Sequence, residues 1–141
     1  MTTSPFIKAF SGRFSGILRW PELDTLWQKI TQQSDWYIYT LAKSHPDTIS
    51  TAEELSEFIS TTDQLLRQEL APDYCGAVYV DNPESPTFVK IFEPHNMGSA
   101  CGSSDNVILP GWILSQGKPC DLVTHFTPKS SAPWWKRVSP L

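Results

Sequence analysis

The sequence has few cysteines: Cys75, Cys101 and Cys120 are the only three among 141 residues. A small secreted domain that depends on disulfides usually shows an even and denser set. An odd, widely spaced set is more typical of reduced thiols in a cytoplasmic protein. We therefore expect a cytoplasmic location and no disulfide framework.

The sequence also lacks long apolar runs and the common catalytic signatures. No stretch approaches the roughly 18 apolar residues that a transmembrane helix requires, so we expect no transmembrane segment. The chain contains no G-x-x-x-x-G-K-[ST], no G-x-G-x-x-G and no G-x-S-x-G, the signatures of P-loop, dinucleotide-binding and α/β-hydrolase sites. No pair of carboxylates is placed for acid–base work, and we predict no catalytic residue. We favour a non-enzymatic protein.

Acidic side chains are scarce at the two ends of the chain. The net charge is −4, from 11 basic and 15 acidic side chains, yet residues 1–20 and 126–141 each carry three basic residues and no acidic one. All the acids therefore lie between these ends, where they outnumber the basic residues. A strongly acidic body repels phosphates, so we expect no nucleic-acid binding.

Three regions follow from composition. Residues 1–20 alternate apolar residues with Ser and Gly, and Gly12 and Gly16 weaken a helix there. We predict a flexible basic and aromatic arm, with ordering on its own domain or on a partner as the alternative. Residues 21–125 carry the periodic patterns of a single α+β domain, and about 140 residues are enough for one core. Residues 126–141 form a Pro/Ser-rich tail with a Trp-Trp-basic cluster, predicted to be extended.

Periodicity predicts the elements of the domain. Helical spacing of apolar residues follows Pro21 and again follows the Ser50–Glu53 capping box. Runs rich in β-branched and aromatic residues predict the strands, and the turn-rich DNPESP predicts a hairpin. The expected fold is a small antiparallel-leaning β-sheet with two amphipathic helices packed on one face, in the order α-β-α-β-β-β. The expected elements are helix 21–33, strand 36–42, helix 51–70, and strands 74–80, 87–93 and 111–115.

The segment 93–110 is much longer than the 4–6 residues that usually join neighbouring elements. Its glycines and serines suit a turned backbone that presents polar groups. The tail adds large aromatic rings next to positive charge, a composition found at interfaces and at membrane surfaces. We predict a small soluble interaction or accessory protein that binds a protein partner or a second copy, with peripheral membrane contact by its termini also open. The predicted binding residues are His95, Asn96, Cys101 and Ser103 in the loop, and Trp134, Trp135, Lys136 and Arg137 in the tail.

A thiol or metal site is the alternative interpretation. His95 and Cys101, together with Cys75 and Cys120, supply the nitrogen and sulfur ligands that zinc or an iron–sulfur cluster uses. A reactive thiol at Cys101 with a histidine neighbour, His95 or His125, is a related option, because an imidazolium lowers a thiol pKa. No C-x-x-C pair is present, so this alternative depends on the fold bringing the ligands together. The primary interpretation requires no cofactor.

Overall fold

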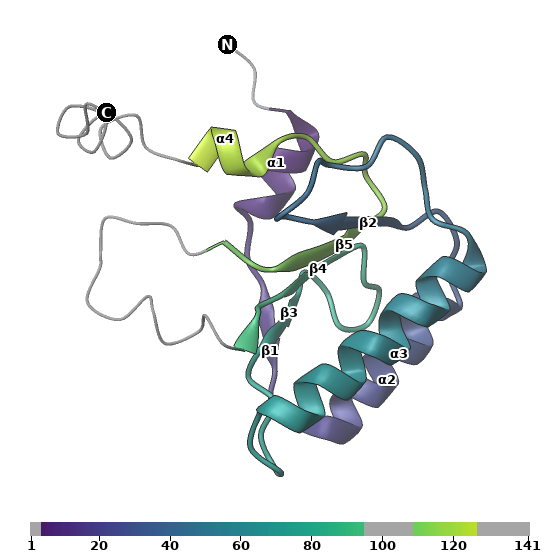
Figure 1. The fold of residues 1–141 in the computed structure, drawn as a ribbon, viewed down its shortest axis with the longest axis vertical. Coiled ribbons are helices and arrows are strands. Elements are labelled where there is room, and N and C mark those ends of the chain that lie inside the picture. Colours follow the sequence, from purple (N-terminus) through teal and green to yellow (C-terminus); the bar gives the residue numbers. More distant parts are fainter. Residues whose placement is uncertain (1–3, 95–108, 127–141) are drawn as a thin grey trace, which may run out of the picture.

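The computed structural model describes residues 4–94 and 109–126 of the chain (Figure 1). Within these ranges, five strands form one sheet in the order β1-β3-β4-β5-β2, and every neighbouring pair is antiparallel. The strands are β1 Ser15–Ile17, β2 Tyr37–Thr40, β3 Val78–Val80, β4 Phe88–Ile91 and β5 Trp112–Ser115; the helices are α1 Pro5–Phe10, α2 Trp20–Thr31, α3 Ala52–Glu69 and α4 Leu122–Phe126.

The predicted fold class is confirmed. The chain is α+β with a small antiparallel sheet, and the two long amphipathic helices α2 and α3 run side by side on one face of it (Figure 1). Each element predicted within residues 21–115 is present, and the strands are shorter than expected because only three or four residues of each one pair.

The long helices begin where side chains satisfy their free N–H groups. In α2 the Glu22 carboxylate accepts hydrogen bonds from the backbone N–H of Leu18 and of Arg19. In α3 the capping box is Thr51 with Glu54, one residue later than the Ser50–Glu53 pair that the sequence predicted. Ser50 instead donates its hydroxyl to the Trp36 carbonyl, 3.0 Å away, and so ties the start of α3 to the sheet.

Alternation along the strands gives the sheet two different faces. On β4, Val89 and Ile91 pack under α2 and α3 in a large aliphatic core. Phe88 points the other way, into a second core that contains Tyr39 of β2 and Ile113 of β5. The β4 side chains that alternate with Val89 and Ile91 therefore face the short helices α1 and α4.

The N-terminal segment differs from its prediction as a flexible arm. Ser4 caps α1 by accepting the Ile7 N–H, and Phe6 and Phe10 are buried against the second face of the sheet. Strand β1 then pairs with β3 and forms an edge of the sheet. Gly12 and Gly16, which weaken a long helix here, both follow the end of α1. Gly16 lies within β1, where a Cβ atom would come within 3.1 Å of the Tyr79 ring. Residues 1–20 thus belong to the domain from residue 4 onward.

The C-terminal helix α4 was not predicted either. Leu122 is fully buried, and its backbone N–H donates to the Tyr39 hydroxyl at 3.2 Å. Asp121 accepts the N–H and the hydroxyl of Thr124, which fixes the first turn. The described residues include no helix that is long and apolar enough to cross a membrane.

Candidate functional site

The predicted binding residues lie outside the described ranges. His95, Asn96, Cys101 and Ser103 fall between residues 95 and 108, and the tail cluster of residues 134–137 lies beyond residue 126. Their role in binding therefore stays a prediction.

Two of the four residues in the metal alternative are described, and the sheet lies between them. Cys75 is 1% exposed in the core beneath α2 and α3, whereas Cys120 packs against the core under α1 and α4. The Cys120 sulfur lies 3.4 Å from the Ser4 hydroxyl. Burial raises the pKa of the Cys75 thiol, which makes it a poor nucleophile and a poor ligand. Zinc, an iron–sulfur cluster and a reactive Cys101 stay predictions that depend on residues 95–108.

No three or more His, Cys, Asp or Glu residues come together as a metal site in the part of the chain that the structure describes. The structure instead shows two other clusters of polar and aromatic groups, one around Lys90 and one around His45. Both lie on the face of the sheet that α1 and α4 partly cover.

The first cluster centres on Lys90, in the middle of β4. Its Nζ lies 4.1 Å from the centre of the Phe10 ring and 3.9 Å from that of the Phe14 ring. An ammonium over a ring face is attracted by the negative face of the π-system. Phe10 ends α1 and Phe14 lies in the link to β1, so the N-terminal segment supplies both rings.

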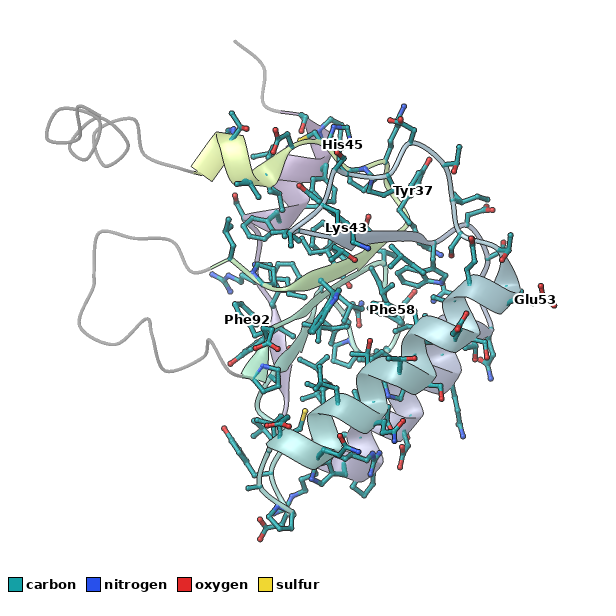
Figure 2. All side chains as sticks on the ribbon, viewed as in Figure 1. Tyr37, Lys43, His45, Glu53, Phe58 and Phe92 are labelled. Atoms are coloured by element: carbon teal, nitrogen blue, oxygen red, sulfur yellow. The ribbon has the colours of Figure 1, made fainter. Side chains whose placement is uncertain are left out.

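Two further aromatic rings continue this surface. Tyr79 of β3 lies directly opposite Lys90 in the register, and its ring meets the Phe92 ring edge-on with centroids 5.6 Å apart. Phe92 follows the end of β4, as Figure 2 shows. Phe14, Tyr79, Lys90 and Phe92 are all partly exposed. These four residues are called the Lys90 surface below.

The charge of Lys90 has no anionic partner among the described residues. Their ion pairs join Lys29 to Glu84 and Arg67 to Asp24 and Asp63. Burial lowers the pKa of Lys90 to about 8, because a partly desolvated ammonium is less stable than one in water. The two ring faces act in the opposite direction, since they favour the charged form. Lys90 is thus a cation in largely apolar surroundings, and the described part of the chain supplies no counter-ion for it.

The second cluster surrounds His45, in the loop after β2 (Figure 2). A hollow of about 520 Å³ lies between residues 41–45 and the start of α4. The Nδ1 atom of His45 is buried and has no hydrogen-bond partner within residues 4–94 and 109–126, and the imidazole lies edge-on to Tyr39 with centroids 6.3 Å apart. The pKa of Asp121 is lowered, first by its hydrogen bonds from Thr124 and to a lesser degree by His45. This cluster offers one imidazole and one carboxylate that already caps a helix.

Part of the Lys90 surface was visible in the sequence. Phe88, Lys90 and Phe92 share one side of a predicted strand. A lysine, which is usually exposed, therefore lies between two aromatic residues, which are often buried. No pattern in the sequence placed Phe10 and Phe14 next to Lys90, because both were assigned to an arm outside the domain.

Comparison with protein-family models, with curated proteins and with solved structures finds no match to this chain.

Proposed function

We propose that this chain is a small non-enzymatic protein that binds a protein partner, and that the Lys90 surface forms part of the contact. The partner segment would carry a carboxylate next to an apolar side chain. The observation that supports this proposal is a cation that has no anionic partner among the described residues and lies beside the partly exposed rings of the Lys90 surface.

The composition of the Lys90 surface is that of an interface. Aromatic residues are enriched where proteins meet, because they bury large areas at a small cost in side-chain entropy. Phe14, Tyr79 and Phe92 supply that area here.

The charge gives the partner its chemistry. Lys90 has already lost part of its hydration, so a carboxylate that reaches it gains an attraction that bulk water screens only weakly. An apolar neighbour of that carboxylate would cover the rings. A partner without an acid would bury the ammonium unpaired, which is costly.

The predicted contacts through residues 93–110 and through the tail at 134–137 belong to the same proposal. Glu93 directly follows Phe92, and Leu109 packs against the core under α1 and α4. The two described ends of the long segment therefore lie on elements that also build or border the Lys90 surface. A cytoplasmic location is part of the proposal, and the free thiols of Cys75 and Cys120 support it.

Site-specific photo-crosslinking in cells tests this function. A benzophenone amino acid replaces Tyr79 in one variant and Tyr37 in a matched control. Tyr37 is also partly exposed, but it lies on β2 at the far edge of the sheet (Figure 2). We expect a discrete protein adduct from position 79, identified by mass spectrometry, and not from position 37.

Charge reversal completes the experiment. Lys90→Glu should abolish the adduct at position 79, whereas Lys43→Glu, at an exposed site in the loop after β2, should leave it intact. An adduct of twice the chain mass would identify the partner as a second copy. Equal adducts from positions 79 and 37, or an adduct that survives Lys90→Glu, would contradict the proposal.

A further inference from the structure

Strand β1 lies at an edge of the sheet and pairs with β3 alone. Ile17 lies opposite Val78, and its carbonyl accepts the Gly76 N–H at 3.2 Å, so the backbone groups of Ile17 face β3. Successive residues of an antiparallel strand turn their N–H and C=O groups to opposite sides. Those of Gly16 therefore point away from the sheet, and neither has a hydrogen-bond partner within residues 4–94 and 109–126.

One face of this edge is apolar. Phe14 and Leu18 lie two residues on either side of Gly16, so alternation places their side chains on the same face of the sheet. Phe14 is partly exposed, Leu18 is 48% exposed, and the Tyr79 ring lies beside Gly16. Phe14 and Tyr79 belong to the Lys90 surface, which therefore extends to the β1 edge.

The other face of the edge carries a hollow of about 270 Å³ between β1, α2 and the turn after β3. Ile17 and Leu26 are among the residues that line it. Its charged side chains already have partners: Glu22 accepts two backbone N–H groups at the start of α2, and Lys29 pairs with Glu84. The hollow has room for a side chain of an added strand, because every second residue of such a strand would point to this face.

Two arginines give the edge its charge. Arg13 and Arg19 are exposed and lie three residues before and three residues after Gly16. Neither takes part in the ion pairs of the described residues. A second copy of the chain that paired antiparallel at Gly16 would place Arg13 opposite Arg19 of the other copy, and like charges opposite each other are destabilising. An acidic segment suits this edge better.

We propose that the β1 edge binds an extended segment of the protein partner as an added antiparallel strand, with its backbone paired to Gly16. The segment carries one acidic residue opposite Arg13, another opposite Arg19, and apolar residues at alternate positions between them. Backbone hydrogen bonds then supply affinity, and the alternate side chains supply specificity. This inference rests on the proposed function, because it concerns the same partner. The carboxylate that reaches Lys90 lies outside the added strand, since β3 separates β4 from β1.

A library of random peptides of about twelve residues, displayed on phage and selected on the full chain, tests the chemistry of the segment. We expect the enriched peptides to share two acids six positions apart, the spacing of Arg13 and Arg19, with apolar residues at alternate positions between them. The most enriched peptide is then synthesised and serves as the probe below. No enrichment, or enrichment without this pattern, would overturn the proposal.

Amide hydrogen exchange, followed by NMR, tests the backbone bond itself. The Gly16 N–H points outward and should exchange rapidly in the free chain. A saturating amount of the probe should slow its exchange at least about tenfold, because the amide then donates to the added strand. Exchange of the Gly16 amide at the same rate with and without bound probe would contradict strand addition.

Gly16→Ala and Gly16→Pro are a matched pair of variants. Both place a Cβ atom beside the Tyr79 ring, and only proline removes the N–H that the added strand needs. Proline is tolerated on an edge strand where the N–H faces outward. We expect the Pro variant to bind the probe about tenfold more weakly than the Ala variant. Equal affinities would show that no backbone bond forms at Gly16.

Charge reversal is a second test, which leaves the backbone of β1 unchanged. Arg13→Glu combined with Arg19→Glu should weaken binding of the probe about tenfold, because both acids of the probe then meet like charges. Lys118→Glu, at an exposed site after β5, should leave the affinity unchanged. An affinity that withstands the double reversal would overturn the charge pattern that we propose.

The strand addition and the proposed function can fail separately. An adduct from position 79 that depends on Lys90 but is unchanged by Gly16→Pro would overturn the strand addition and leave the function intact. No adduct from position 79 would contradict the function itself. Self-association of the chain that Gly16→Pro abolishes would assign the edge to a second copy, against the proposal.

Discussion

The two faces of the sheet are closed in different ways. One face is covered by α2 and α3, of 12 and 18 residues, and its core is mainly aliphatic. The other is covered by α1 and α4, of six and five residues, and its core is rich in aromatic rings. At about 1.5 Å per residue, α3 is about 27 Å long, whereas α1 is about 9 Å. Five strands about 4.8 Å apart span about 19 Å between their outer axes. A single turn or two of helix cannot cover that width.

The difference teaches where chemistry can reside in this fold. Under the long helices the sheet residues Val78, Val89 and Leu114 are fully buried, and Cys75 there is an inert thiol. On the other face the described residues cover the sheet only in part, so that Lys90 is partly exposed beside aromatic rings and a hollow lies beside His45. One face thus provides stability, and the other combines stability with an accessible surface.

The largest expected effect tests whether α1 is part of the fold. Phe6 is 4% exposed, and its ring centre lies 5.2 Å from that of Phe88. Phe6→Ala should lower the free energy of unfolding by about 4 kcal/mol, measured by urea denaturation, because it leaves a cavity over the sheet. If residues 1–20 were a free arm, the loss would stay below about 0.5 kcal/mol.

Truncation of a single side chain on the aliphatic face should lower the free energy of unfolding by a similar amount. Leu66 of α3 is fully buried, and Leu66→Ala should cost about 3 kcal/mol in the same measurement. Leu18→Ala is the matched control, since Leu18 is 48% exposed, and it should change stability by less than about 0.5 kcal/mol. A small effect of Leu66→Ala would mean that α3 is only loosely packed.

Loss of the polar contact between the long helices should lower the free energy of unfolding by a smaller amount. Asp63 accepts the Trp27 indole N–H at 3.1 Å and pairs with Arg67, while Asp24 accepts a hydrogen bond from the Arg67 Nη2 atom at 2.6 Å. Asp63→Ala leaves a partly buried indole N–H without its partner, and we expect a loss of about 1–2 kcal/mol. The more exposed Asp24 should tolerate Ala within about 0.5 kcal/mol. Equal losses would show that the ion pair, and not the indole bond, stabilises the helix pair.

The smallest expected effect is the pH dependence that Lys90 adds on the aromatic face. Its pKa is lowered to about 8 in the folded protein, whereas the unfolded chain has the ordinary value of 10.5. Between these two pH values the unfolded state holds more protons, so stability rises with pH. Relative to Lys90→Met, the wild-type free energy of unfolding should therefore increase from pH 8 to pH 10.5, by about 1 kcal/mol after allowance for solvent screening. A constant difference between the two proteins would mean that Lys90 is fully hydrated.

Sequence patterns predicted the half of the molecule that depends on long periodic elements. The stripes of α2 and α3, and the β-branched strands between residues 36 and 115, carry enough repeats for their type to be clear. Short elements such as α1 and β1 carry too few repeats for their type to be clear. The pattern of Phe6, Phe10 and Phe14 reads as one weak helix along the chain, because local spacing says nothing of the surface against which these rings pack. In α1 and β1 tertiary contacts override a poor local preference.

The candidate site divides in the same way. The sequence by itself determined that Phe88, Lys90 and Phe92 share one side of a strand, because side chains alternate along extended backbone whatever surrounds them. Only the tertiary structure decided that Phe10 and Phe14 lie over that lysine and that Cys75 and Cys120 lie on opposite faces of the sheet. Such contacts join residues far apart in the chain, and their geometry is set by the packing of whole elements.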